Sequence, residues 1–110
     1  MKRLTLKQFR YFEALARHGH FRHAAESCSI SQPALSMQIR ELEDSLGAAL
    51  FERSARQVSI TAFGEQFALR VREILRSVDE LEDLARATRD RLAGRIRIGV
   101  IPTIAPYLLP

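Results

Sequence analysis

The stretch from Ser31 to Leu46 constrains this chain most strongly. Ser31 is a suitable helix N-cap, and Pro33 falls in the first turn, where its missing N–H costs nothing. Apolar residues then recur with the spacing of one buried helical stripe, at Leu35, Ile39, Leu42 and Leu46. No carboxylate occurs between Cys28 and Arg40. A helix that begins without negative charge, and with its positive dipole end exposed, suits the groove of a polyanion, so we interpret it as a recognition helix.

Two helices are predicted before this stretch. The first begins after Thr5 as N-cap and ends at Gly19. Its expected apolar face consists of Leu6, Phe9, Phe12, Leu15 and Ala16. The second carries Phe21, Ala24, Ala25 and Cys28 on one face, and only residues 29–31 separate it from the recognition helix. Two helices joined this tightly indicate a helix-turn-helix.

A hairpin is predicted after Gly47, with strands at residues 50–53 and 58–60. Beside a recognition helix such a hairpin would act as a wing. Arg56 lies at its expected tip and Arg53 near its base. An exposed arginine in these places can reach a minor groove or a phosphate.

A long helix is predicted after Thr61, because no glycine or proline interrupts residues 65–93. Its apolar residues recur at alternating steps of four and three, which is the seam of a coiled coil. Phe63 and Phe67 can pack on the N-terminal helices, whereas the later residues are expected to pair with a second copy. The predicted seam consists of Val71, Ile74, Val78, Leu81, Ala85 and Leu92.

Gly94 is predicted to end the long helix, and residues 95–101 alternate in the manner of a strand. A single strand has no sheet to join, so either it pairs with something absent or the chain is the front part of a longer protein. The expected fold is therefore mainly α: a winged helix-turn-helix over residues 1–61, a dimerisation helix over 62–93, and a hinge with the first strand of a truncated α/β domain over 94–110.

The charge of the chain is +4, and it is unevenly distributed. Residues 1–60 hold nine Lys and Arg against six acids, a balance of +3, whereas residues 61–94 hold six against seven, a balance of −1. A basic N-terminal part favours nucleic acid as partner. The N-terminus has no apolar signal core and no run long enough to span a membrane, so we expect a cytoplasmic protein that does not bind membranes.

Other classes of function receive less support from the residues. There is no nucleophile–histidine–carboxylate spacing and no glycine-rich phosphate loop, so we predict neither an enzyme nor a cofactor. His20 and His23 lack cysteine or carboxylate partners for a metal, and Cys28 lies on an apolar face as a small core residue. A dimeric interaction module with a basic face remains an alternative. An RNA-binding module is disfavoured, because no aromatic platform for bases is present.

The chain resembles the DNA-binding end of LysR-type transcriptional regulators. The residues that carry this resemblance are Ala24-Ala25-Glu26, Ser31-Gln32-Pro33-Ala34-Leu35-Ser36, Gln38-Ile39, Leu42-Glu43, Leu46-Gly47, Leu50-Phe51-Glu52-Arg53 and Thr61. Within the family, residues 20–28, 98–103 and 106–110 resemble the hydrogen-peroxide-responsive branch. A regulator that answers to a small metabolite is the alternative within the family.

The resemblance implies a winged helix-turn-helix, a linker helix that dimerises and an effector domain that begins near Gly94. Family members bind interrupted palindromes of double-stranded DNA as dimers or tetramers, and RNA polymerase is a candidate partner of a full-length regulator. Carried over, the base contacts are Gln32, Pro33, Ser36 and Met37, and the wing residue for the minor groove is Arg56. The implied phosphate contacts are Arg22, Ser31, Gln38, Arg40 and Arg53.

Overall fold

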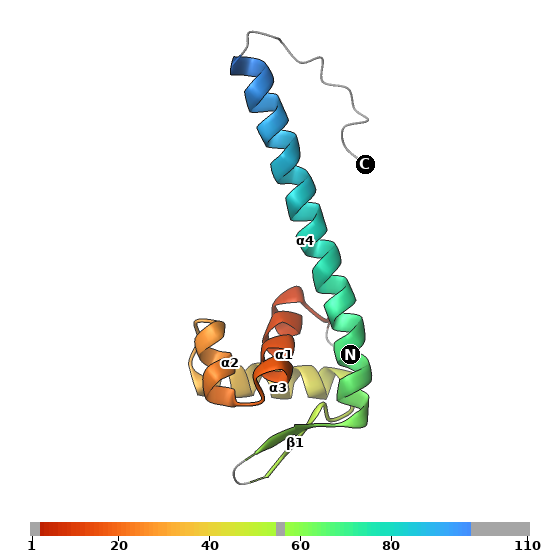
Figure 1. Cartoon of the computed structure of the whole chain (residues 1–110). Coiled ribbons are helices and arrows are strands. Elements are labelled where there is room, and N and C mark those ends of the chain that lie inside the picture. The colour runs from red at the N-terminus through yellow and green to blue at the C-terminus, as the bar shows by residue number, and fades with distance from the viewer. Residues whose placement is uncertain (1–2, 55–56, 98–110) are drawn as a thin grey trace. The chain divides into compact units, whose positions relative to one another are not determined.

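The computed structural model describes residues 3–54 and 57–97 (Figure 1). Within these ranges the elements are α1 (Leu6–His18), α2 (Phe21–Ser27), α3 (Gln32–Leu46), β1 (Phe51–Arg53), β2 (Val58–Ile60) and α4 (Ala62–Arg97). The chain forms two compact units, Met1–Arg76 and Ser77–Pro110. The mainly helical fold with a short hairpin is as predicted. The expected strand over residues 98–101 lies outside the described ranges.

The ends of the first three helices follow from their capping residues. The Thr5 hydroxyl accepts a hydrogen bond from the backbone N–H of Gln8 at 3.1 Å, and the Gln8 side chain accepts one in return from the Thr5 N–H at 3.0 Å. Gly19 and Gly47 end α1 and α3 in the left-handed conformation, with φ angles of 72° and 71°. Glycine adopts that conformation without steric cost, which explains why both helices end there as predicted.

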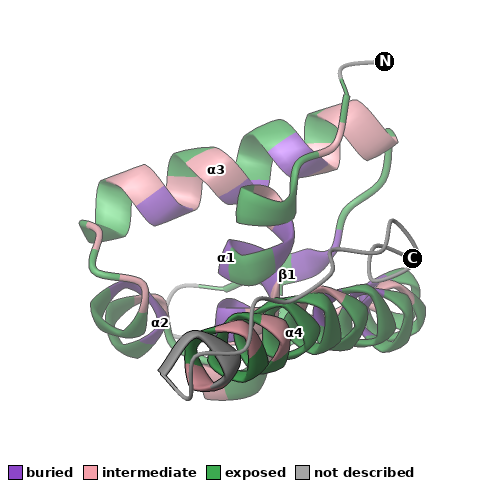
Figure 2. Cartoon of the chain, turned by 90° about the horizontal axis from the view of Figure 1, so that it is seen from above, coloured by how far each residue is buried: buried purple, intermediate pink, exposed green. Residues whose placement is uncertain are grey.

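The core of the first unit lies where α1, α2, α3 and β1 meet, as the purple segments in Figure 2 show. The predicted stripe of α3 is correct for Leu35, Ile39 and Leu42, which have no exposed surface. The predicted face of α1 needs a correction. Leu6 is 44% exposed, and Tyr11 and Ala14 are buried instead. Because α1 packs against α2 and α3 and also against Phe67 of α4, its buried face is wider than one stripe.

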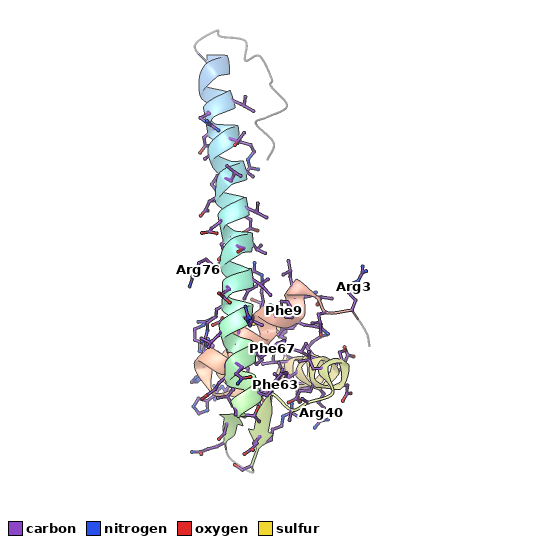
Figure 3. All side chains as sticks on the ribbon, turned by 90° about the vertical axis from the view of Figure 1, so that its right-hand side faces the viewer. Arg3, Phe9, Arg40, Phe63, Phe67 and Arg76 are labelled. Carbon is purple, nitrogen blue, oxygen red and sulfur yellow. The ribbon has the colours of Figure 1, made fainter. Side chains whose placement is uncertain are left out.

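Aromatic rings join α1 to the beginning of α4. The Phe67 ring lies 5.9 Å from the Phe9 ring and 5.2 Å from the Phe12 ring, both edge to face, and 5.8 Å from the Phe63 ring (Figure 3). Edge-to-face pairs stabilise beyond the area they bury. These contacts confirm that Phe67 packs on α1, whereas Phe63 contacts Phe67 of its own helix and is 38% exposed.

Ala68 and two larger residues of α4 belong to the same core. Val71 is 1% exposed and Leu75 is 9% exposed. The structure therefore assigns Val71 to the interior of the first unit rather than to a seam open to a second copy. The heptad spacing could not predict this burial, because one apolar stripe continues along α4. Its first residues pack in the core of the first unit, and its later residues lie at the surface. Ile74, the next predicted seam residue, is 41% exposed.

In the second unit the predicted seam lies at the surface of α4. Leu81 is 62% exposed, and Val78 and Leu92 are partly exposed. The helix does not end at Gly94 but continues to Arg97, so residues 95–97 are helical where a strand was expected. A glycine costs a helix only about 1 kcal/mol relative to alanine, which does not suffice to stop it. No helix in the described ranges is both long and apolar enough to span a membrane.

Candidate nucleic-acid interface

The turn between α2 and α3 depends on a left-handed residue. Ser29 has a φ of 57°, and its N–H donates to the Glu26 carbonyl at 3.1 Å. The next N–H, from Ile30, donates to the Ala25 carbonyl at 3.0 Å, while the Ile30 side chain packs against the core. These bonds close α2, and a short turn leads from it into α3. The predicted helix-turn-helix is therefore present. The conformation of Ser29 had no signal in the sequence, because glycine or asparagine usually marks it.

The opening turns of α3 present their polar side to solvent. Ser31 caps the helix by accepting a hydrogen bond from the Ala34 N–H at 3.2 Å, as predicted. Gln32, Pro33 and Arg40 are exposed, and Met37 is 60% exposed. Helical spacing places Pro33, Met37 and Arg40 on the side away from Leu35 and Ile39, and Arg40 lies at the outer surface of α3 in Figure 3. Gln32 is three residues before Leu35 and is exposed because it stands in the first turn of the helix. Ser36 and Gln38 are half-buried, so they stand at the margins of this face.

The N-terminal part of α2 adds polar side chains near this surface. The guanidinium of Arg22 pairs with Glu26 at 3.5 Å, and 79% of its side chain is exposed. An ion pair this exposed is weak, so Arg22 can bind another anion in place of Glu26. The rings of His20 and His23 lie edge to face at 5.3 Å, and both residues are exposed.

The hairpin forms as predicted. Strand β1 pairs antiparallel with β2, in the register Phe51 to Ile60 and Arg53 to Val58. Phe51 is buried and Val58 and Ile60 are half-buried, so one side of the hairpin faces the core. Arg56, the predicted minor-groove residue, lies outside the described ranges.

The base of the hairpin is attached to α3 through one carboxylate. The Oε2 atom of Glu43 accepts hydrogen bonds from the backbone N–H groups of Leu50 at 2.7 Å and Phe51 at 3.2 Å. Its Oε1 atom accepts one from Nη2 of Arg53 at 3.3 Å. The Arg53 guanidinium also lies 5.6 Å from the centre of the Phe21 ring. Sequence reasoning missed this role of Glu43, because ten residues separate the acid from its arginine and no spacing rule relates them.

On its other side the hairpin is tied to α4. The Thr61 hydroxyl donates to the Ala49 carbonyl at 2.8 Å and accepts from the Gly64 N–H at 2.9 Å. The first bond holds the segment before β1, and the second caps α4 as predicted. A Cβ atom on Gly64 would lie 2.3 Å from the Leu50 carbonyl oxygen, so only glycine fits there.

Cys28 stands at the edge of the core rather than inside it, which corrects the expectation that it is an ordinary buried residue. It is half-buried and packs against the core cluster. It also lines a surface hollow of about 420 Å³ together with Lys7, Arg10 and Arg17. Its Sγ atom lies 3.9 Å from the Ser27 hydroxyl.

The sequence profile of the family described as "Bacterial regulatory helix-turn-helix protein, lysR family" matches residues 6–65. This chain belongs to the LysR family. It is 46% identical over 107 residues to the Escherichia coli "DNA-binding transcriptional dual regulator OxyR", covering 97% of this chain and 35% of that protein. The LysR-type chain therefore spans about a third of the length of the curated relatives it matches.

Solved structures agree with this assignment. Full-length OxyR from Pseudomonas aeruginosa superposes with a TM-score of 0.74 at 40% identity, over 77% of this chain and 29% of that one. The "Crystal structure of CbnR_DBD-DNA complex" superposes with a TM-score of 0.72 at 36% identity. The match covers 78% of this chain and 99% of that one. The predicted LysR-type resemblance, its peroxide-responsive branch and the winged fold are thus confirmed. These relatives are transcription regulators rather than enzymes, so the interaction module is not favoured.

Proposed function

We propose that this LysR-type chain binds double-stranded DNA sequence-specifically, as the DNA-binding part of a regulator that responds to hydrogen peroxide. The observation that carries the proposal is the exposed, acid-free beginning of α3 on a helix-turn-helix. The relatives named as OxyR or hydrogen-peroxide-inducible activators support the peroxide response, and the CbnR domain crystallised with DNA supports the partner.

In this proposal the beginning of α3 enters the major groove. Gln32 can bond an adenine edge through both amide atoms, Ser36 can donate to or accept from a base, and Met37 and Pro33 offer apolar contact to a thymine methyl group. The remaining polar side chains bind phosphates on either side of the contacted bases, since each of these side chains can donate a hydrogen bond. These phosphate contacts are Arg22, Ser31, Gln38 and Arg40, and the proposed minor-groove residue is Arg56.

The assembly follows from the exposed seam of α4. Ile74, Val78, Leu81, Ala85 and Leu92 would pair two copies, so that two recognition helices read an interrupted palindrome. We infer a winged helix-turn-helix over residues 1–61 and a linker helix over 62–97, with an effector domain after the linker helix. Such a protein acts where the chromosome is, in the cytoplasm. Tetramer formation and contact with RNA polymerase belong to the same proposal.

The experiment is a selection of duplexes from a random library by the unaltered chain, followed by binding measurements in rising salt. We expect enriched duplexes with inverted half-sites and an affinity at least about a thousandfold above that of a scrambled duplex. The logarithm of the affinity should fall linearly with the logarithm of the salt concentration. Equal affinity for selected and scrambled duplexes, or a preference for single-stranded RNA, would contradict the proposal.

A further inference from the structure

The carboxylate of Glu43 is the meeting point of three elements in the first unit. It lies near the end of α3, and it accepts hydrogen bonds from two consecutive backbone N–H groups at the start of β1 and from the side chain of Arg53 at its end. Arg53 in turn lies over the ring of Phe21, the first residue of α2. The recognition helix, the wing and α2 are therefore connected through one ion pair.

The surroundings make this pair stronger than an ordinary surface pair. Only 14% of the Glu43 side chain and 29% of the Arg53 side chain are exposed, whereas 79% of the Arg22 side chain is exposed in its pair with Glu26. Hydrogen bonds to a charged group are stronger than neutral ones, and partial burial reduces the screening by water. Arg53 is thus held at one site in the protein, while Arg22 is open to a phosphate.

We propose that Glu43 and Arg53 form a wing latch, a pair of positioning residues that sets the wing against the recognition helix. Arg53 then acts through the wing and not through a phosphate, contrary to the role carried over from the family resemblance. The latch rests on the proposed function, because it matters only if α3 and the wing contact DNA together. Its second effect is to neutralise the Glu43 charge on the helix that faces the DNA.

The latch should affect binding only to a DNA site that α3 and the wing contact at the same time. A wing that moves relative to α3 must be ordered when the complex forms, and this ordering opposes binding. Non-specific binding to DNA depends on the net charge of the protein and does not require a fixed wing. Weakening the latch at Glu43 should therefore lower the affinity for a selected duplex while leaving or raising the affinity for a scrambled one. The loss of the Arg53 charge lowers the affinity for a scrambled duplex as well.

The test uses Glu43→Gln, Arg53→Gln and the double variant of the 110-residue chain. The matched control is Glu41→Gln, an exposed acid on the same helix whose loss changes the charge equally. The probes are one duplex selected by the unaltered chain and the same duplex scrambled. Circular dichroism reports whether each variant is folded, and amide exchange at Leu50 and Phe51 reports the latch without DNA.

For the selected duplex we expect each single variant to lose about three- to tenfold in affinity and the double variant to lose no more than either. For the scrambled duplex, Glu43→Gln and Glu41→Gln should bind as well as the unaltered chain or more tightly, and the double variant should match it. The control should keep its affinity for the selected duplex. The amides of Leu50 and Phe51 should exchange faster in Glu43→Gln.

The opposite pattern would overturn the latch. If Arg53→Gln weakens both duplexes alike and lowers the salt slope by about one, while Glu43→Gln binds the selected duplex normally, Arg53 is a phosphate contact. Unchanged amide exchange in Glu43→Gln would also contradict the proposal. A failure of the proposed function looks different, since the unaltered chain itself would then select no duplex.

Discussion

At the scale of single residues, Gly64 and Gly94 form a matched pair within one helix. A Cβ atom at Gly64 would meet the Leu50 carbonyl oxygen at 2.3 Å and the Ile60 side chain at 2.7 Å, whereas a Cβ atom at Gly94 meets nothing within 4 Å. We expect Gly64→Ala to lower the free energy of unfolding by about 1–3 kcal/mol, because backbone atoms must move. Gly94→Ala should leave the free energy of unfolding unchanged or raise it by up to about 1 kcal/mol. Urea unfolding followed by circular dichroism checks both, and equal midpoints would contradict the close approach.

Gln32 and Ser36 carry the proposed reading of bases. Gln32→Ala and Ser36→Ala should each weaken binding to a selected duplex by about 1–3 kcal/mol and binding to a scrambled duplex much less, because base contacts add only to specific binding. Gel shifts with both duplexes measure the difference. Gln66→Ala and Ser77→Ala on α4 serve as controls, since both are exposed and lie outside the recognition helix. Equal losses on the two duplexes would remove these residues from base recognition.

At the scale of elements, local signals in the sequence account for most of the fold. Caps such as Thr5 and Ser31 and helix ends such as Gly19 are set by neighbours within four residues, so their chemistry could be read directly. The wing latch could not, because Glu43 and Arg53 meet only after the chain has turned. The burial of Val71 in the core was also not predicted, since one apolar stripe can face either the core or a second copy.

The long helix α4 leads to a prediction about assembly. Leu81 is 62% exposed in the single chain, and in a dimer it would face its counterpart across the seam. Leu81→Glu removes two buried leucines and opposes two charges, so the dimerisation constant should fall by about a hundredfold or more. Sedimentation over a range of concentrations measures this constant, and circular dichroism checks that the fold persists.

Ala87→Glu is the control for that substitution. Ala87 is exposed on the same helix and lies outside the predicted seam, so the same new charge should leave the dimer intact. If both variants remain dimeric, the seam is wrongly assigned. If both dissociate, charge on α4 and not the position of Leu81 controls assembly.

At the scale of the whole molecule, the charges and the apolar surface separate along the chain. The excess of basic residues belongs to residues 1–60, whereas most of the exposed large apolar residues lie on α4, at Phe63, Leu69, Ile74, Leu81 and Leu84. This division matches a proposed division of labour, in which one part binds a polyanion and the other pairs two copies. Two linked half-sites then bind more tightly than one, because the second binding event becomes intramolecular.

A peroxide response proposed for the full-length regulator raises the question of whether these 110 residues can sense peroxide. Reversible sensing by a disulfide requires a second thiol near the sulfenic acid, and this chain contains only Cys28. That residue is half-buried and packs against the core, at the end of α2. We therefore expect equal affinity for a selected duplex before and after mild peroxide, in the unaltered chain and in Cys28→Ser.

Gel shifts under reducing and oxidising conditions test this indifference, and non-reducing electrophoresis of the same samples detects any disulfide between two copies. A peroxide-dependent loss of binding that disappears in Cys28→Ser would place a sensor within the DNA-binding part itself. Binding that is unchanged in both proteins would assign the response to residues beyond those of this chain.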